Sequence, residues 1–276
     1  MPYLAFLPDL TAALGVPFQK RKVDHLDFIV AGVQKAGTTA LHYFLAAHPH
    51  IALPRDQALH FFDKEENFDG EPDYNVLHNN FDPGFRWKIA GEVTADYVYY
   101  RPAIERIAQY NPKMKLIISL RNPIDRAFSH WNMRRAKGSE PLDFLDAIKR
   151  DQSQRGSRAE RGNAHIDRGL YTDQIQRVFR FFPRDQVLII KYEDFRANYR
   201  ATIDAIFDFL GLMRLPHVKN KEQNAGPYQR KITAEERQSV SAIFEEDISR
   251  LEALLGWDCS DWRFKSAVPC AAPASV

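Results

Sequence analysis

The stretch Phe28-Ile-Val-Ala-Gly-Val-Gln-Lys-Ala-Gly-Thr-Thr-Ala-Leu41 decides the fold. It begins with a β-rich apolar run that ends at Gly32, continues with small residues, and opens an amphipathic segment at Thr38. A strand that passes through a glycine-containing turn into a helix is the arrangement that holds phosphate in P-loop proteins. Here, however, Lys35 precedes the second glycine, whereas in the nucleotide-triphosphate loop G-x-x-x-x-G-K-[ST] the lysine follows it. The stretch therefore predicts an anion-binding loop in which the lysine has a different task.

Apolar runs alternate with helical patterns along the rest of the chain. The predicted strands are Asp27–Gly32, Trp87–Val93, Met114–Leu120 and Gln186–Lys191. The predicted helices are Thr38–Ala47, Pro102–Tyr110, Pro123–Ala136, Tyr171–Phe182, Tyr199–Leu210 and Thr233–Leu255. The strands are continuously apolar in their centres, which is typical of a parallel sheet covered by helices on both faces. The pattern predicts a single α/β domain with a P-loop-like parallel sheet flanked by helices, and ligands at the carboxyl ends of its strands.

The composition is ordinary for a globular protein. Of the 276 residues, 45% are hydrophobic and 27% are charged, and the length suits one large domain or at most two. A formal net charge of +2 does not argue for a nucleic-acid partner. No run approaches the ~20 apolar residues that span a bilayer. The two cysteines, Cys259 and Cys270, do not make a disulfide framework and fit a reducing cytoplasm.

The ends of the alternating pattern predict the domain boundaries. We expect an N-terminal arm or helix over residues 1–26, the domain over 27–262 and a C-terminal tail over 263–276. The apolar N-terminus lacks the basic residues that precede the apolar run of a targeting signal. Two polar segments, Arg150–Arg168 and Asn220–Lys231, are predicted as loops. Thr233, with Glu236 three residues later, predicts a capping box at the start of the last helix.

The turn after the first strand has the composition of an anion nest. Gly32 and Gly37 belong to this turn, and Ala36 and Gly37 have little or no side chain, so a phosphate can approach the backbone N–H groups. The hydroxyls of Thr38 and Thr39 add donors at the start of the helix. The alternative is an ordinary strand–turn–helix connection with a capping threonine. The turn alone therefore favours, but does not decide, an anion site.

A second segment, Arg121-Asn-Pro-Ile-Asp-Arg-Ala-Phe-Ser129, follows directly on a predicted strand. Asn122 is a suitable N-cap, and Pro123 occupies the favoured first helical position. Arg121 therefore projects from the carboxyl end of a strand, and Ser129 lies roughly 9–10 Å further along the helix axis. Both can reach one anion. The alternative is a helix start with a structural arginine.

Together, G-V-Q-K-A-G-T-T-A-L and R-N-P-I-D-R-A-F-S resemble the two phosphate-binding motifs of sulfotransferases that use 3′-phosphoadenosine 5′-phosphosulfate (PAPS). The former resembles their 5′-phosphosulfate loop and the latter their 3′-phosphate site. Five further matches follow in order: H-F-F-D at His60–Asp63, G-E-V-T-A-D-Y at Gly91–Tyr97, G-L-Y at Gly169–Tyr171, V-L-I-I-K-Y-E-D-F at Val187–Phe195 and L-E-A-L-L-G-W-D-C-S-D-W at Leu251–Trp262. The resemblance extends over residues 27–262. It is closest to the heparan-sulfate-type branch and its bacterial relatives.

The resemblance implies that PAPS is the donor and 3′-phosphoadenosine 5′-phosphate (PAP) the product. Charge grows chiefly on the bridging oxygen of the leaving 5′-phosphate, and Lys35 is placed to stabilise it. The moving SO₃ group carries little negative charge, so no metal is required. Tyr228 is a candidate stacking face for adenine, and Arg230 and Lys231 are candidate donors in the same loop, although such a pair is also typical of a solvated turn. The residues expected to hold the nucleotide are Gln34, Lys35, Ala36, Gly37, Thr38, Thr39, Arg121, Ser129, Tyr228, Arg230 and Lys231.

Two positions depart from the family pattern and bear on catalysis. Ala58 stands where similar proteins usually carry a glutamate base, and Val93 stands where many carry a lysine. We expect His60 to act as the base, with Asp63 as its orienting partner; the alternative is a structural histidine. Glu92 is a second candidate catalytic carboxylate, or it holds Lys35 or a loop in place. The sequence also fits a catalytically inactivated variant.

The leading prediction is a sulfotransferase acting on a hydroxyl or amine. The alternatives are a P-loop ATP-dependent kinase, which the lysine position disfavours, and a non-catalytic nucleotide-binding protein, which Ala58 leaves open. We expect the acceptor to be a small molecule, a lipid or a glycan. The arginines in Arg150–Arg168 would suit recognition of an acidic acceptor, or they belong to a solvated loop. A set of aromatic residues would instead suit an apolar acceptor cleft. That set is Phe61, Phe62, Tyr97, Tyr99 and Tyr100. We expect a bacterial cytoplasmic enzyme with no membrane span and no nucleic-acid partner; the sequence does not indicate its oligomeric state.

Overall fold

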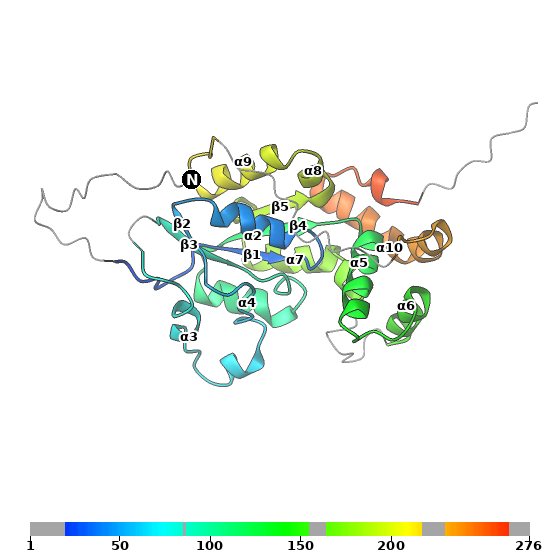
Figure 1. The fold of residues 1–276 in the computed structure, drawn as a ribbon, viewed down its shortest axis with the longest axis horizontal. Helices are drawn as coiled ribbons and strands as arrows, with labels where there is room; N and C mark the ends of the chain where they lie inside the picture. Colours follow the sequence, from blue (N-terminus) through cyan, green and yellow to red (C-terminus); the bar gives the residue numbers. More distant parts are fainter. Residues whose placement is uncertain (1–19, 85–86, 155–163, 217–229, 265–276) are drawn as a thin grey trace, which may run out of the picture.

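Five parallel strands form one sheet in the order β2-β3-β1-β4-β5 (Figure 1). The computed structural model describes residues 20–84, 87–154, 164–216 and 230–264. β1 (Phe28–Gly32) lies in the centre and pairs with β3 (Ile89–Val93) and β4 (Lys115–Leu120). β5 (Val187–Lys191) and β2 (Ile51–Ala52) form the two edges. The predicted fold class, a parallel α/β sheet, is confirmed.

The four predicted strands are present and begin one or two residues later than expected. The sequence prediction missed β2, which has only two residues and is half-buried, too short for any periodicity to appear. It also missed the short helices α3 (Asn75–His78) and α8 (Tyr192–Ala197) and the longer helix α6 (Phe144–Ser153). The single-turn 3₁₀ segments are η1 (Glu65–Phe68), η3 (Asp167–Gly169), η4 (Arg184–Gln186) and η5 (Ser260–Trp262).

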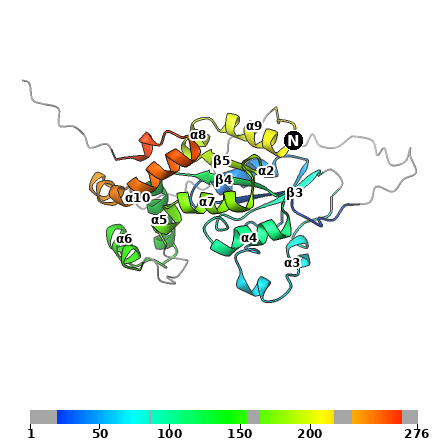
Figure 2. The same ribbon diagram turned by 180° about the vertical axis from the view of Figure 1, so that it is seen from behind.

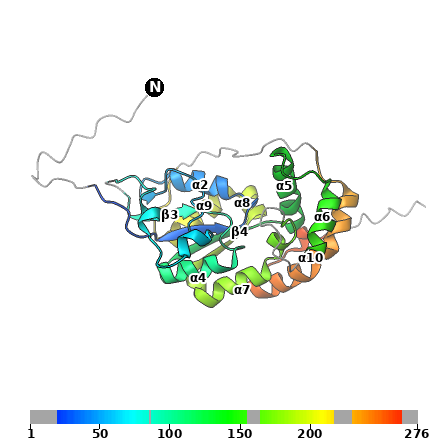
Figure 3. The ribbon, with the colours of Figure 1, turned by 90° about the horizontal axis from the view of Figure 1, so that it is seen from below.

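Both faces of the central strand are buried, each under its own helices. Phe28 and Val30 belong to one apolar cluster, and Ile29 and Ala31 belong to the other. The first cluster lies under α2 (Thr38–Ala46), α8 and α9 (Tyr199–Leu210), and the second lies under α4 (Arg101–Tyr110) and α7 (Thr172–Phe181). Figure 3 shows these two groups of helices on opposite sides of the sheet. This double covering explains why the strands are apolar throughout.

Three helices pack together beside the sheet (Figure 2). They are α5 (Pro123–Ala136), α6 (Phe144–Ser153) and α10 (Ala234–Leu255). The prediction of a loop over Arg150–Arg168 was wrong at its start, because α6 runs to Ser153. The reason is an amphipathic spacing in which Phe144, Ala147, Ile148 and Asp151 are all buried. Among the described residues, no helix has the length and apolarity that a bilayer crossing requires.

The predicted caps of two helices are confirmed. The side chain of Asn122 accepts hydrogen bonds from the backbone N–H groups of Ile124 at 3.0 Å and Asp125 at 3.3 Å. At the start of α10, Thr233 Oγ1 accepts from Glu236 N at 3.1 Å, and the Glu236 carboxylate accepts from Thr233 N at 2.9 Å. The ends of α5 and α10 that face the nucleotide motifs are therefore fixed by side-chain caps.

Thr233→Ala is expected to lower the free energy of unfolding by about 1 kcal/mol, because an N–H group in the first turn of α10 loses its partner. Urea denaturation followed by circular dichroism measures this loss. Ser239→Ala, an exposed substitution on the same helix, is the control and is expected to change stability by less than about 0.5 kcal/mol. An equal loss in both variants would contradict a capping role for Thr233.

Candidate active site

The predicted anion loop, residues 33–37, connects β1 to α2 and is bound to the neighbouring strand β4. The Ser119 carbonyl accepts from Val33 N at 2.9 Å, and Ser119 Oγ donates to the Ala36 carbonyl at 2.7 Å. Lys35 and Gly37 both have a left-handed backbone, with φ of 75° and 82°. The conformation of the loop is thus set jointly by its own turns and by β4.

Gly37 caps α2 where the loop meets a tyrosine that the sequence prediction did not single out. A Cβ atom at position 37 would lie 2.8 Å from the ring of Tyr192, so this close approach requires glycine. No described side chain caps α2, and its first turn carries no acidic residue. The N-terminus of α2 therefore offers backbone donors and a positive dipole end to an anion.

Arg121 joins the two predicted phosphate motifs. Its Nη1 donates to the Lys35 carbonyl at 3.0 Å, and its guanidinium lies 5.0 Å from the ring centroid of Tyr192. Lys35 follows β1 and Arg121 follows β4, and these strands are neighbours in the sheet. The sequence prediction that both motifs lie at the carboxyl ends of strands is therefore confirmed, and the structure places them in contact.

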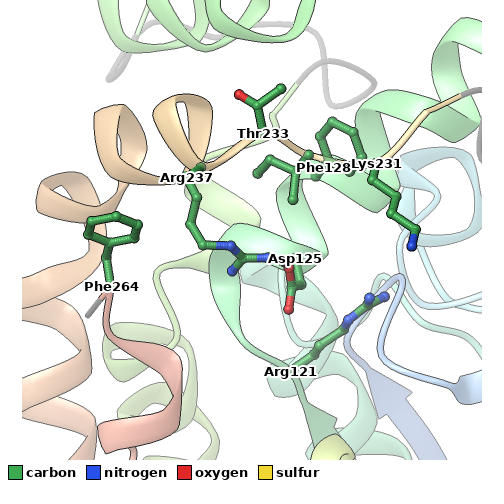
Figure 4. Close-up of a pocket in the computed structure, with 9 residues that line it drawn as sticks. Arg121, Asp125, Phe128, Lys231, Thr233, Arg237 and Phe264 are labelled. Atoms are coloured by element: carbon green, nitrogen blue, oxygen red, sulfur yellow. Dashed lines mark hydrogen bonds and ion pairs between the residues drawn. The ribbon is translucent and has the colours of Figure 1, made fainter. Parts of the chain in front are cut away.

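Arg121 also lines two adjoining cavities, of about 480 and 370 Å³. In the larger one, the side chains of Arg121 and Lys231 extend toward one another, and Asp125 forms an ion pair with Arg237 (Figure 4). The larger cavity is lined by Arg121, Asp125, Phe128, Lys231, Ile232, Thr233, Ala234, Arg237 and Phe264. The smaller is lined by Arg121, Asp125, Tyr192, Glu193, Arg196 and Ala197. The cleft beside the anion loop thus has cationic side chains from three separate segments.

The remaining residues of the predicted nucleotide set differ in their placement. Ser129 lies on α5 and is only 3% exposed, whereas Gln34 is half-buried in the anion loop. Arg230 makes a bidentate contact with Glu236, with N–O distances of 2.6 and 2.7 Å, so a phosphate contact would require this pair to open. Tyr228 lies outside the described residues.

Glu193, in the K-Y-E-D segment, has a structural position with partners that sequence reasoning did not identify. We expected it to cap a helix or to pair with a basic residue. Instead, its carboxylate accepts from Asn122 N at 3.0 Å and from the indole Nε1 of Trp262 at 3.1 Å. Both partners are far away in the sequence, so local pattern reasoning could not have found them.

On the other side of the anion loop, His60 and Asp63 form the predicted pair. His60 Nδ1 lies 2.9 Å from Asp63 Oδ2, and the His60 side chain is 38% exposed. This hydrogen bond raises the pKa of His60 above its usual value, and the nearby carboxylates of Asp96 and Glu92 add to the effect. Asp96 itself forms an ion pair with Arg168. An imidazole nitrogen of His60 and carboxylate oxygens of Asp63 and Asp96 lie within 4.8 Å of one another, a cluster that sequence spacing did not predict. Each of the three side chains already has an oppositely charged or hydrogen-bonding partner: His60 pairs with Asp63, and Asp96 pairs with Arg168.

Glu92 is fully buried, which disfavours the first of its two predicted roles, a catalytic carboxylate, and leaves the second, a residue that holds a loop in place. Its carboxylate accepts from the hydroxyls of Tyr97 at 2.7 Å and Thr94 at 3.0 Å. Burial raises the pKa of Glu92 to about 7. Phe61, Phe62 and Tyr97 are also core residues, so the prediction that they line an apolar acceptor cleft was wrong. Large aromatic side chains in an alternating α/β pattern are as suitable for the core as for a cleft.

Comparison with known proteins identifies the fold family. A family model described as the sulfotransferase domain matches residues 25–225, which is more than half of the chain. The chain belongs to the sulfotransferase family. The predicted domain boundaries at residues 27 and 262 stay a prediction, although the family match begins close to the first of them.

This sulfotransferase is similar to two groups of curated proteins. It is 28% identical to the human bifunctional heparan sulfate N-deacetylase/N-sulfotransferase 2 over 202 residues, which are 67% of this chain and 22% of that protein. It is 30% identical to the mouse heparan sulfate glucosamine 3-O-sulfotransferase 3B1 over 187 residues, which are 68% of this chain and 46% of that protein. The chain therefore spans less than half the length of these relatives.

Solved structures place the sulfotransferase fold on most of the chain. A sulfotransferase from Alicyclobacillus acidocaldarius superposes with a TM-score of 0.75 at 27% identity, over 87% of this chain and 99% of that one. A mouse sulfotransferase complexed with PAP shares the fold at a TM-score of 0.52 and 14% identity, over 83% of this chain and 86% of that one. The predicted resemblance to the heparan-sulfate-type branch and to bacterial relatives is thus confirmed at the level of the family.

Proposed function

We propose that this sulfotransferase moves a sulfuryl group from PAPS to a hydroxyl or amine of an acceptor. The observation that carries the proposal is the contact between Arg121 and the backbone of the lysine loop. It brings the two elements proposed to bind anions together at the edge of the sheet where α/β proteins bind their ligands. A donor with a 5′-phosphosulfate and a 3′-phosphate requires two such elements.

Each phosphate group of the nucleotide has a proposed set of donors. Residues 34–39 would hold the 5′-phosphosulfate, through backbone N–H groups of the loop and the start of α2. Arg121, Ser129 and Lys231 would hold the 3′-phosphate, since Arg121 and Lys231 share one cavity. Tyr192, between Gly37 and Arg121, would lie against the nucleotide. The mouse neighbour that was solved with PAP supports this choice of nucleotide.

The proposed transfer is an in-line displacement at sulfur. The acceptor oxygen or nitrogen forms a bond to sulfur as the bond from sulfur to the bridging oxygen breaks, and the electron pair of that bond stays on the 5′-phosphate. Lys35 stabilises this charge where it develops. His60 takes the proton from the acceptor, and its half-exposed position beside Asp63 suits that role. Little charge develops on the SO₃ group itself, so we expect no metal requirement.

The acceptor is proposed only as a chemical class. The names of the relatives describe transfer to a nitrogen and to the 3-hydroxyl of glucosamine, which supports an amine or hydroxyl acceptor here. Phe61, Phe62 and Tyr97 are core residues, so Tyr99 and Tyr100, both half-buried, are the candidate aromatic contacts to an acceptor from the predicted set. An acceptor screen should therefore include glycans, lipids and small aromatic alcohols.

Calorimetric titration with PAP, ADP and ATP plus magnesium tests the nucleotide assignment. We expect PAP to bind at least about tenfold more tightly than ADP, because the 3′-phosphate adds charge-assisted hydrogen bonds. Equal or tighter binding of ATP would instead favour a P-loop kinase. Absence of binding by all three nucleotides would contradict a functional nucleotide site.

Ala58→Glu tests whether the chain is an inactivated enzyme or a non-catalytic nucleotide-binding protein. Position 58 lies two residues before His60, and a positioned base contributes about 10²–10⁴-fold to a rate. We expect the substitution to raise the rate of PAP release from PAPS at least about tenfold, with PAP affinity unchanged. Ala58→Gln adds the same bulk without a base and is the control. If neither variant turns over PAPS and PAP still binds, the hypothesis of a non-catalytic nucleotide-binding protein is favoured.

A further inference from the structure

A chain of hydrogen bonds runs from the backbone beside His60 to Glu92. The Tyr97 hydroxyl accepts from Phe61 N at 3.0 Å and from Phe62 N at 3.5 Å. Thr94 Oγ1 accepts from His60 N at 3.5 Å. Both hydroxyls donate to the Glu92 carboxylate, one to each oxygen. Residues 60–62 are therefore connected through two hydroxyls to one buried carboxylate.

The direction of these bonds defines what Glu92 must do. A hydroxyl has one proton, so a hydroxyl that accepts from a backbone N–H has only that proton to donate onward. Glu92 accepts on both carboxylate oxygens. An ionised carboxylate is acceptor-only, whereas a protonated carboxyl carries an O–H donor on one oxygen and accepts less well there. A proton on either oxygen would set two donors, the carboxyl O–H and the facing hydroxyl, against each other, so the bond that Glu92 accepts from that hydroxyl would weaken or reverse. An ionised Glu92 is thus the form that completes the chain.

The backbone of this segment is in a conformation that needs such support. Ala58 and His60 both have a left-handed backbone, with φ of 61° and 52°, which is unfavourable for residues other than glycine. Such conformations persist where surrounding contacts hold them. The hydrogen bonds through Thr94 and Tyr97 act on residues 60–62, immediately at this point.

We propose that Glu92 is a positioning residue: through the hydroxyls of Thr94 and Tyr97 it holds the backbone of residues 60–62, and so fixes His60 against Asp63. Glu92 does not touch the acceptor or the donor, because its side chain has no exposed surface. The catalytic meaning of this arrangement rests on the proposed role of His60 as the base. The arrangement itself requires neither nucleotide nor acceptor.

The charges around this chain set its dependence on pH. His60 faces Asp63 from its own segment and Asp96 and Glu92 from the strand β3 and the turn after it, and Arg168 of η3 pairs with Asp96. The pKa of Glu92 is raised to about 7 by burial. As the pH falls through this value Glu92 gains a proton, and the bond that it accepts from one of the two hydroxyls weakens or reverses. We therefore expect the support of residues 60–62 by Glu92 to be strongest above about pH 7.

The test is a proton titration of His60 by NMR with ¹³C-labelled histidine, in protein without nucleotide. His60→Asn identifies the signal among the nine histidines, and Asp63→Asn shows how far the pKa falls when the partner is removed. We expect Glu92→Gln, Thr94→Val and Tyr97→Phe each to lower the His60 pKa by about half a unit or more, because a looser segment weakens the bond to Asp63.

Tyr110→Phe is the matched control. The Tyr110 hydroxyl also accepts a backbone N–H, from Leu26 at 2.7 Å, and its ring packs 5.5 Å from Phe62, but it has no bond to Glu92. We expect this variant to lose stability while the His60 pKa stays unchanged. If the pKa moves only in Glu92→Gln, Glu92 acts through its charge alone and the proposal is overturned. A shift in Tyr110→Phe as large as in Tyr97→Phe would also overturn it, because the effect would then be general loosening.

Two features of the design keep the result interpretable. If Tyr97→Phe does not fold, Thr94→Val and Glu92→Gln decide, since both are close in shape to the residues they replace. Failure of PAP to bind would contradict the proposed function and would not affect the NMR titration of His60, which uses protein without nucleotide. The two proposals therefore fail separately.

Discussion

Replacing Arg121 with alanine is expected to weaken PAP binding about 100-fold, which corresponds to about 2.7 kcal/mol. The loss is large because the guanidinium would provide paired, charge-assisted hydrogen bonds to the 3′-phosphate inside the cleft. ADP lacks that phosphate, so its affinity is expected to fall less than about fivefold. Calorimetric titration of both nucleotides measures the difference.

Two controls separate phosphate recognition from loop support, because Arg121 also donates to the Lys35 carbonyl. Arg250→Ala removes the same charge from an exposed arginine that lines neither cavity and pairs with Asp173. It is expected to leave both affinities unchanged. Arg121→Lys keeps the charge and loses the planar fork, so an intermediate loss is expected. Equal losses for PAP and ADP in Arg121→Ala would mean that the residue supports the loop and does not recognise the 3′-phosphate.

Lys35→Ala is expected to slow sulfuryl transfer about 10²–10³-fold, because the stabilising charge is then absent where the leaving phosphate becomes negative. PAP affinity should fall less than about tenfold, since the backbone donors of the loop and α2 are retained. The rate is measured as PAP release from PAPS in a single turnover, with water or an acceptor from the screen.

Lys231→Ala is the matched control for Lys35, because Lys231 is a second lysine of the same cleft, placed beside Arg121. It is expected to weaken PAP binding several-fold and to leave the rate from bound PAPS within about threefold. If Lys35→Ala loses affinity in proportion to rate, the lysine binds the ground state and transition state equally. A catalytic role at the leaving oxygen would then be excluded.

Much of the fold was predictable because burial on two faces leaves a strong pattern in the sequence. The runs that became β1, β3, β4 and β5 are apolar in their centres and are separated by amphipathic helices. β2 escaped because two half-buried residues carry no periodicity. The sequence prediction missed α6 because polar side chains, including the buried Asp151, give its end the composition of a loop.

The candidate site was less predictable, because its contacts join distant segments. Motif spacing placed Arg121 and the lysine loop at strand ends, but only the structure shows that one donates to the other. Tyr192 follows β5 directly and was not predicted to lie at the site. Its ring lies against Gly37 because β5 and β1 belong to the same sheet, a tertiary contact that local sequence does not show. Glu92 was a candidate catalytic carboxylate by residue type and position, yet its side chain is buried and bonded to Tyr97 and Thr94. Residue type predicted the chemistry, and tertiary contact decided which atoms are accessible.

The strand order has a consequence for how this protein can change over evolutionary time. From β1 the chain leaves through α2 toward β2 and β3, and from β4 it leaves in the opposite direction toward β5, with α2 and α7 on opposite faces of the sheet. β1 and β4 therefore flank the switch point at which α/β sheets form a crevice. Its existence depends on topology and core packing, and not on the side chains that occupy it. Exposed residues along this crevice can therefore be exchanged with little effect on folding, and we expect new acceptors to be acquired in this way while the proposed nucleotide contacts stay the same.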